Sequence, residues 1–137
     1  MTISGNDVFR AVFADVKAEE NGLLHVQVKF EGELTREMLL EHKQLIFERT
    51  RHFTDTGKKL GVLFDVRQIS LLKIPQTVMK ENATDDPFLE LQKGVALLVN
   101  SKLFQQVASF YIRIYRPTVA TRVFTDEANA RQWLLSL

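Results

Sequence analysis

Two charged residues stand at the end of one long apolar stretch of the chain. Residues 60–66 form a nearly unbroken apolar run of strand length, in which Asp65 is the only acidic residue, and Arg67 follows directly. A strand without polar alternation is usually covered on both faces, as in the middle of an α/β sheet. Ligands of open α/β sheets bind at the carboxyl ends of the strands. Asp65 and Arg67 are therefore candidates for a ligand or partner contact.

The same two residues also fit a structural interpretation, which we favour. An aspartate after a strand commonly caps the next turn, and an arginine beside it commonly makes a surface ion pair. The sequence alone leaves both interpretations of Asp65 and Arg67 open.

The other residue types that support catalysis or metal binding are dispersed. His25, His42 and His52 lack the spacing of a known metal motif, and a structural role is favoured for each over a metal or catalytic one. Asp85 and Asp86 precede a proline, which is more typical of a solvated helix start than of a cation-binding loop. The chain has no cysteine, no glycine-rich phosphate loop and no Gly-x-Ser-x-Gly motif. We therefore expect no enzyme, no metal and no cofactor; an enzyme that uses the strand-end aspartate or a histidine is the disfavoured alternative.

Apolar periodicity and turn residues predict an α/β fold. Strands are expected over residues 8–18, 23–30, 60–66, 95–99 and 120–124, and helices over 35–52 and 102–115 and after a cap at Thr125. The Asn-Gly pair at residues 21–22 predicts that the first two strands form an antiparallel hairpin. Two short helices are expected between residues 67 and 92, at Pro75 and Pro87. The order predicts a mixed sheet of about five strands, with an N-terminal hairpin followed by β-α units and with helices packed on the sheet.

Length and composition predict one ordinary globular domain over residues 1–137. The chain is 45% hydrophobic and 26% charged, and its net charge of +1 gives no large electrostatic field toward nucleic acid or an anionic membrane. The first residues lack the pattern of a signal peptide, and no apolar run is long enough to span a bilayer. We expect a cytoplasmic, bacterial protein with no nucleic-acid partner and no transmembrane segment.

Residues 110–116 mix aromatic and basic side chains, and Arg113 and Arg116 are candidates for contact with an acidic partner or a lipid headgroup. The favoured interpretation is structural, because the helix over 102–115 is needed to cover the sheet. Its wide apolar face is expected to consist of Leu103, Val107, Phe110, Tyr111 and Ile114.

Apolar residues of the middle segment form a second candidate site. Met79, Phe88 and Leu91, together with Tyr111, could line a pocket for a lipid or another apolar small molecule. The alternatives are ordinary core packing or a dimer contact.

The order of elements and several motifs resemble the SpoIIAA-like proteins of the STAS/CRAL-TRIO-like class. The shared features are the opening hairpin, the helix start Gly-Glu-Leu-Thr at residues 32–35, the apolar strand that ends near Asp65, and the ending at residues 122–134, where a short strand, Phe-Thr-Asp and an alanine-containing helix close on Trp-Leu. The similarity extends from Leu23 to Leu137. It implies a STAS-like fold in a bacterial branch of the class.

The resemblance also shows where this chain departs from the anti-anti-sigma pattern. The positions that match the phosphorylatable serine turn are Ile74 and Pro75, and neither can accept a phosphate. Ser70 and Thr77 are nearby hydroxyls, and Ser70 and Lys73 are further candidates for partner contacts. We therefore expect a non-enzymatic regulatory or protein-interaction module, and a homodimer, whose protein partner the sequence does not name; the alternative is binding of an apolar ligand in a CRAL-TRIO-like pocket.

Overall fold

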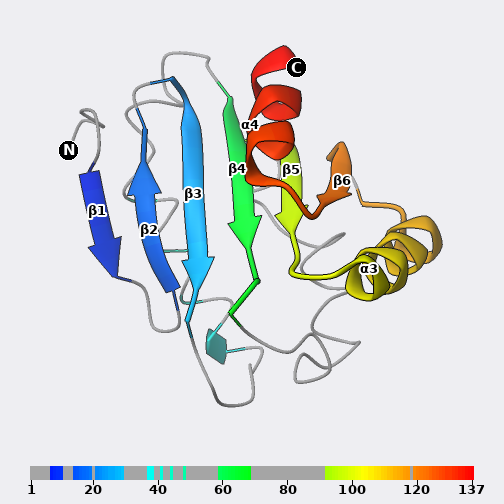
Figure 1. Cartoon of the computed structure of the whole chain (residues 1–137). Coiled ribbons are helices and arrows are strands. Elements are labelled where there is room, and N and C mark those ends of the chain that lie inside the picture. The colour runs from blue at the N-terminus through cyan, green and yellow to red at the C-terminus, as the bar shows by residue number, and fades with distance from the viewer. Residues whose placement is uncertain are drawn as a thin grey trace.

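All strands that the structure describes belong to one mixed sheet. The computed structural model describes residues 7–10, 14–19, 21–29, 37–38, 41, 44, 48, 59–68, 92–117 and 119–137. The strands are β1 (Asp7–Arg10), β2 (Ala14–Ala18), β3 (Leu23–Val28), β4 (Leu60–Asp65), β5 (Gln92–Leu98) and β6 (Thr121–Phe124), and they lie side by side in this order (Figure 1). The pairs β1–β2 and β2–β3 are antiparallel, and the strands from β3 to β6 run parallel. The predicted α/β fold, with a hairpin followed by parallel strands, is confirmed.

The hairpin between β2 and β3 has the turn chemistry that its sequence predicts. Gly22 adopts a φ of 85°, a left-handed conformation that costs little without a Cβ. The side chain of Asn21 accepts a hydrogen bond from the backbone N–H of Leu23 at 3.2 Å. These two residues reverse the chain and set the register in which Ala18 pairs with Leu24.

The first predicted strand, over residues 8–18, is wrong in one respect. The chain reverses within this stretch, so that residues 7–10 pair antiparallel with residues 15–18 as β1 and β2. A single strand of that length would extend far beyond β3, which has six residues. Division into two strands lets both pair fully, and the described sheet therefore has six strands.

In the described part of the chain, α3 (Lys102–Tyr115) follows β5 and α4 (Glu127–Ser136) follows β6. Ser101 caps α3, and the chain leaves the helix through Arg116, which has a φ of 47° and precedes Pro117. The cap of α4 is Asp126 and not the predicted Thr125, since the Asp126 carboxylate accepts from the backbone N–H of Asn129. Residues 37–38, 41, 44 and 48 are helical, in agreement with the helix predicted over 35–52.

The two faces of the sheet form separate apolar clusters. α3 contributes to one, which consists of Val16, Ala18, Leu24, Val26, Val28, Leu60, Val62, Val66, Val99, Ala108 and Val123, with Met38 packed against it. α4 contributes to the other, which consists of Leu23, Leu63, Ala96, Leu98, Phe124, Ala130 and Leu134, with Trp133 packed against it. Neighbouring residues of a strand, such as Leu23 and Leu24, enter different clusters because successive side chains point to opposite faces.

α4 lies over only half of its face of the sheet. It contacts β4, β5 and β6 (Figure 1). This close approach depends on the absence of a Cβ at Gly61 and Gly94, because a Cβ there would press against Leu134 or Leu137. The same face of β2 and β3 carries polar residues instead: Asp15, Lys17, His25, Gln27 and Lys29. Among the described residues, no helix is long and apolar enough to cross a membrane.

Candidate functional site

Asp65 ends β4 with a carboxylate that is 1% exposed and bound by Arg67. The backbone N–H of Arg67 donates to Oδ1 of Asp65 at 3.1 Å, which closes a tight turn directly after the strand. The guanidinium then folds back onto the same carboxylate, with Nε at 3.0 Å from Oδ1 and Nη2 at 2.8 Å from Oδ2. This bidentate geometry is the strongest form of an arginine–carboxylate pair. The structure therefore brings the two predicted site residues together, in the arrangement of the structural interpretation.

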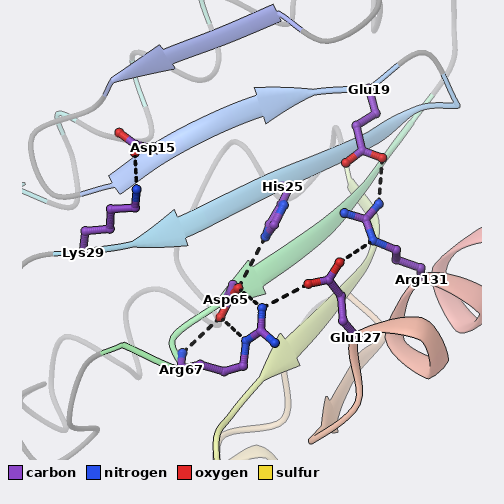
Figure 2. A network of polar contacts seen from close by, with 8 residues as sticks. All are labelled: Asp15, Glu19, His25, Lys29, Asp65, Arg67, Glu127 and Arg131. Carbon is purple, nitrogen blue, oxygen red and sulfur yellow. Dashed lines mark hydrogen bonds and ion pairs between the residues drawn. The ribbon is translucent and has the colours of Figure 1, made fainter.

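The pair is part of a larger polar network, in which Arg67 and Arg131 connect three carboxylates. Nη2 of Arg67 also donates to Glu127 at 3.0 Å. Glu127, in the first turn of α4, accepts from Nε of Arg131 at 3.0 Å, and Nη1 of Arg131 donates to Glu19 at 2.7 Å. Figure 2 shows these residues running from the end of β4 along α4 to the end of β2. The network thus fixes α4 against the polar half of the sheet.

His25 completes the network from β3. Its Nε2 lies 3.5 Å from Oδ2 of Asp65, at the limit of a hydrogen bond, and its side chain is 18% exposed. Gln27 of β3 lies opposite Asp65 of β4, and His25, two residues before Gln27, lies on the same face of the strand. The side chains of His25 and Asp65 therefore share one face of the sheet (Figure 2). We use the term polar network for Glu19, His25, Asp65, Arg67, Glu127 and Arg131.

The electrostatics of the polar network favour its charged form. Burial alone would raise the pKa of Asp65, but the hydrogen bonds and the positive charge of Arg67 outweigh it and hold that pKa below its usual value. The hydrogen bond from Arg131 lowers the pKa of Glu127 in the same way. The hydrogen bond to Asp65 raises the pKa of Arg67. Asp65 and Glu127 are therefore carboxylates at neutral pH.

His25, Asp65 and Glu127 could in principle hold a metal ion. Their ligand atoms lie within 4.8 Å of one another, and one imidazole with two carboxylates is a donor set that suits zinc or iron. However, Nη2 of Arg67 already lies between the two carboxylates, at 2.8 Å from Asp65 and 3.0 Å from Glu127. A metal ion would have to displace this cation, so we assign the three residues to the ion-pair network.

The outer face of α3 differs from the polar network in being apolar and exposed. Leu103, Phe110 and Ile114, which we call the α3 stripe, are 67%, 55% and 53% exposed. Tyr111 is half-buried and packs edge-on against Phe110, with 6.2 Å between ring centroids. The prediction that the whole apolar face of this helix covers the sheet is therefore wrong for the α3 stripe.

The side of α3 that packs on the sheet consists of residues outside the α3 stripe. Ala108 is fully buried, and Phe104 and Ile112 pack against the same cluster. The carboxamide of Gln105 donates to the backbone carbonyl of Val123 at 3.3 Å. Because these residues already fill the contact with the sheet, the α3 stripe is turned outward.

The remaining candidates divide into described and undescribed residues. Arg113 and Arg116, the candidates for contact with an acidic partner or a lipid headgroup, are exposed. The partner candidates Ser70 and Lys73, the pocket candidates Met79, Phe88 and Leu91, and the positions Ile74, Pro75 and Thr77 lie outside the described residues. The apolar pocket and the absence of the serine switch therefore stay predictions.

The sequence interpretation did not connect four members of the polar network with Asp65: Glu19, His25, Glu127 and Arg131. One signal was available. In a parallel sheet the helix after β6 begins at the edge where β4 ends, so the acidic first turn of α4 had to lie near Asp65. The contact of Arg131 with Glu19, 112 positions away, has no comparable local signal.

The sheet, its order of strands and the two helices define a SpoIIAA-like α/β domain. The chain belongs to a family of domains of unknown function, DUF7793, whose sequence profile matches residues 17–137. Its structure is similar to the crystal structure of an uncharacterised protein from the DUF3478 family, with a SpoIIAA-like fold, from Shewanella loihica PV-4. The two share a TM-score of 0.50 and 15% identity over 98% of this chain and 97% of the other. A search of curated proteins finds no match. The predicted resemblance to SpoIIAA-like proteins is confirmed at the level of the fold.

Proposed function

We propose that this domain is a non-enzymatic regulatory or protein-interaction module whose contact surface is the outer face of α3. The observation that carries the proposal is the exposure of the α3 stripe. Of the five large apolar side chains that are exposed in the described part of the chain, Leu103, Phe110 and Ile114 lie on this one helix. Single exposed apolar residues are ordinary, whereas a group of them on one element is typical of a binding surface.

The polar network supports the non-enzymatic part of the proposal. A general base needs a free lone pair within reach of the substrate and a pKa matched to the operating pH. Both oxygens of Asp65 accept hydrogen bonds from Arg67, and the pKa of this carboxyl is lowered, which weakens it as a base. Catalysis by Asp65 would require the bidentate pair to break.

Crosslinking in the cells from which the chain comes tests whether a protein binds to the outer face of α3. A photoreactive benzoylphenylalanine at Phe110 is expected to crosslink a protein in high yield, because this position lies in the α3 stripe. The matched control carries the same residue at Leu135, which is 49% exposed on α4. The variant Phe110→Gln, without the photoreactive residue, should lose the same partner in an affinity pull-down.

Equal crosslinking at both positions, or none at Phe110, would count against α3 as the contact surface. A catalytic role for the polar network would instead be indicated if Arg67→Lys abolished a biological activity while the crosslink at Phe110 remained. This outcome would reject the non-enzymatic proposal, since lysine keeps the charge and loses the bidentate geometry.

A further inference from the structure

We propose, building on the interaction function above, that the outer face of α3 binds an amphipathic α-helix of a partner protein, and that this partner helix carries acidic residues along one flank. Three properties of α3 lead to this partner: the spacing of its exposed apolar residues, the charges beside them, and the position of the helix at the margin of the molecule.

The apolar residues of α3 have the spacing of a helix-packing seam. Leu103, Val107, Phe110 and Ile114 follow one another at intervals of four, three and four residues, which is the period of a coiled-coil seam. The half-buried Val107 lies between the exposed residues of the α3 stripe. At a rise of about 1.5 Å per residue, the seam is about 17 Å long and matches about three turns of a partner helix.

The flank of this seam is positively charged. Lys102, Arg113 and Arg116 are exposed, and none of them makes an ion pair with a residue that the structure describes. α3 contains no acidic residue. Complementary charge beside a seam selects the partner and its orientation, so the partner helix is expected to place glutamate or aspartate opposite Arg113.

The position of α3 leaves the seam accessible. Figure 1 shows the helix beside β6, which is the edge strand of the sheet farthest from β1, and β6 is the strand that α3 contacts most. Because Ala108 faces the sheet and Phe110 faces outward, a partner helix can approach without moving α3.

The same observations disfavour two other occupants of the seam. In a pair of identical helices, Lys102, Arg113 and Arg116 of both copies would lie close together with no acidic residue from either helix, and like charges repel. A membrane-surface helix needs a broad apolar face, whereas a seam with a period of 3.5 residues is narrow. The opposite flank of α3, at Phe104 and Ile112, packs on the domain itself and cannot enter a bilayer.

The test uses the protein that crosslinks at Phe110, after its identification and purification. Its affinity for the full chain is measured by calorimetry at several salt concentrations. Arg113→Glu is expected to weaken binding about tenfold, and the loss should shrink as salt rises, because a rim charge pair is screened. Phe110→Gln is expected to weaken binding by about thirtyfold or more, as for a central apolar anchor.

Two matched variants control for general effects of charge and of surface change. Lys59→Glu reverses an exposed charge that lies outside α3 and should change the affinity less than twofold. Leu135→Gln removes an exposed apolar residue on α4 and should also leave it unchanged. Circular dichroism of each variant confirms that it is folded, and the crosslinked peptide of the partner is expected to be helical and acidic.

Each contrary result identifies what has failed. Equal affinity of wild type and Arg113→Glu, or a basic crosslinked peptide, would overturn the acidic helix but leave the interaction function of α3 standing. Absence of any protein crosslink at Phe110 would overturn both proposals. A crosslink to a second copy would replace the partner with a homodimer. The chain could instead sediment with vesicles that contain phosphatidylglycerol and not with phosphatidylcholine alone. If Phe110→Gln also abolished this sedimentation, a lipid surface would replace the partner helix.

Discussion

The side chains of the polar network and those of the α3 stripe differ in how far they contact other residues of the domain. Asp65 is 1% exposed and accepts three hydrogen bonds from Arg67, which itself binds Glu127 on α4. Phe110, in contrast, is 55% exposed on a helix whose sheet-facing side is already filled. The residue types most often associated with catalysis therefore hold this fold together, while the apolar residues expected in its core remain available for contact.

The proposed contact function therefore rests on exposed apolar surface and not on the residue types that are associated with catalysis. A buried carboxylate is costly unless it is paired, so a buried Asp65 demands a partner such as Arg67 for stability alone. An exposed phenylalanine has no such internal requirement. The ring of Phe110 packs edge-on against Tyr111 but stays 55% exposed beside Leu103 and Ile114, and this exposed area is the basis of the proposed contact.

The largest expected effect on stability comes from removing the cation of the polar network. Arg67→Ala leaves the buried carboxylate of Asp65 without its bidentate partner, while Glu127 also loses a contact. Breaking a fully buried pair costs about 3–5 kcal/mol and an exposed pair about 0–1 kcal/mol; since Arg67 is 37% exposed, we expect about 2–3 kcal/mol. Urea unfolding at pH 7 measures the change.

The ion pair between Lys29 and Asp15 provides the control for this prediction. It is as short as the pair of Arg67, at 2.8 Å, but its side chains are 48% and 30% exposed. Lys29→Ala is therefore expected to cost less than about 1 kcal/mol. If the two substitutions had similar effects, burial would not distinguish the polar network from a surface ion pair, and the comparison above would fail.

A smaller effect is expected from neutralising Asp65, and it should depend on pH. Asp65→Asn leaves Arg67 half-exposed, where water can hydrate the guanidinium, so the expected loss at pH 7 is about 1–2 kcal/mol. The pKa of Asp65 is lowered in the folded protein, so its stabilising contribution is complete above its unfolded pKa of about 3.9 and is lost as the pH falls through the folded pKa.

The unfolding free energies of wild type and Asp65→Asn are therefore expected to differ at pH 7 and to converge below about pH 4. Urea titrations at several pH values test this. A difference that stayed constant over the whole range would mean that the carboxylate charge does not account for the stabilisation, and that Asp65 acts through its shape or its neutral hydrogen bonds.

Local sequence signals predicted the elements of the fold well. The turn at Asn21 and Gly22 and the bounds of the helix predicted over residues 102–115 each depend on residues within a few positions of one another. Along β3, apolar residues alternate with His25 and Gln27, and the structure buries Leu24, Val26 and Val28 on one face of the strand.

The polar network and the exposure of the α3 stripe depend on how elements pack, which local signals do not contain. Arg67 and Glu127 are 60 positions apart, and they meet because the ends of β4 and β6 share one edge of the sheet. The α3 stripe was expected to pack on the sheet because it belongs to the wide apolar face of a helix that is needed to cover the sheet. Ala108, which belongs to the same buried cluster as Val123, marks the side of α3 that faces the sheet.

The smallest expected effect on stability is at the α3 stripe, where a substitution is expected to weaken binding strongly but to change the unfolding free energy little. Phe110→Gln is expected to change the unfolding free energy by less than about 0.5 kcal/mol, because the ring is more than half exposed and glutamine is a good helix former. Phe104→Gln, six positions earlier on the same helix, removes a ring that packs on the core and should cost about 2 kcal/mol. Urea unfolding of both variants compares the two sides of α3 directly. A loss at Phe110 as large as that at Phe104 would show that the α3 stripe stabilises the domain itself, and its exposure would then no longer indicate a partner.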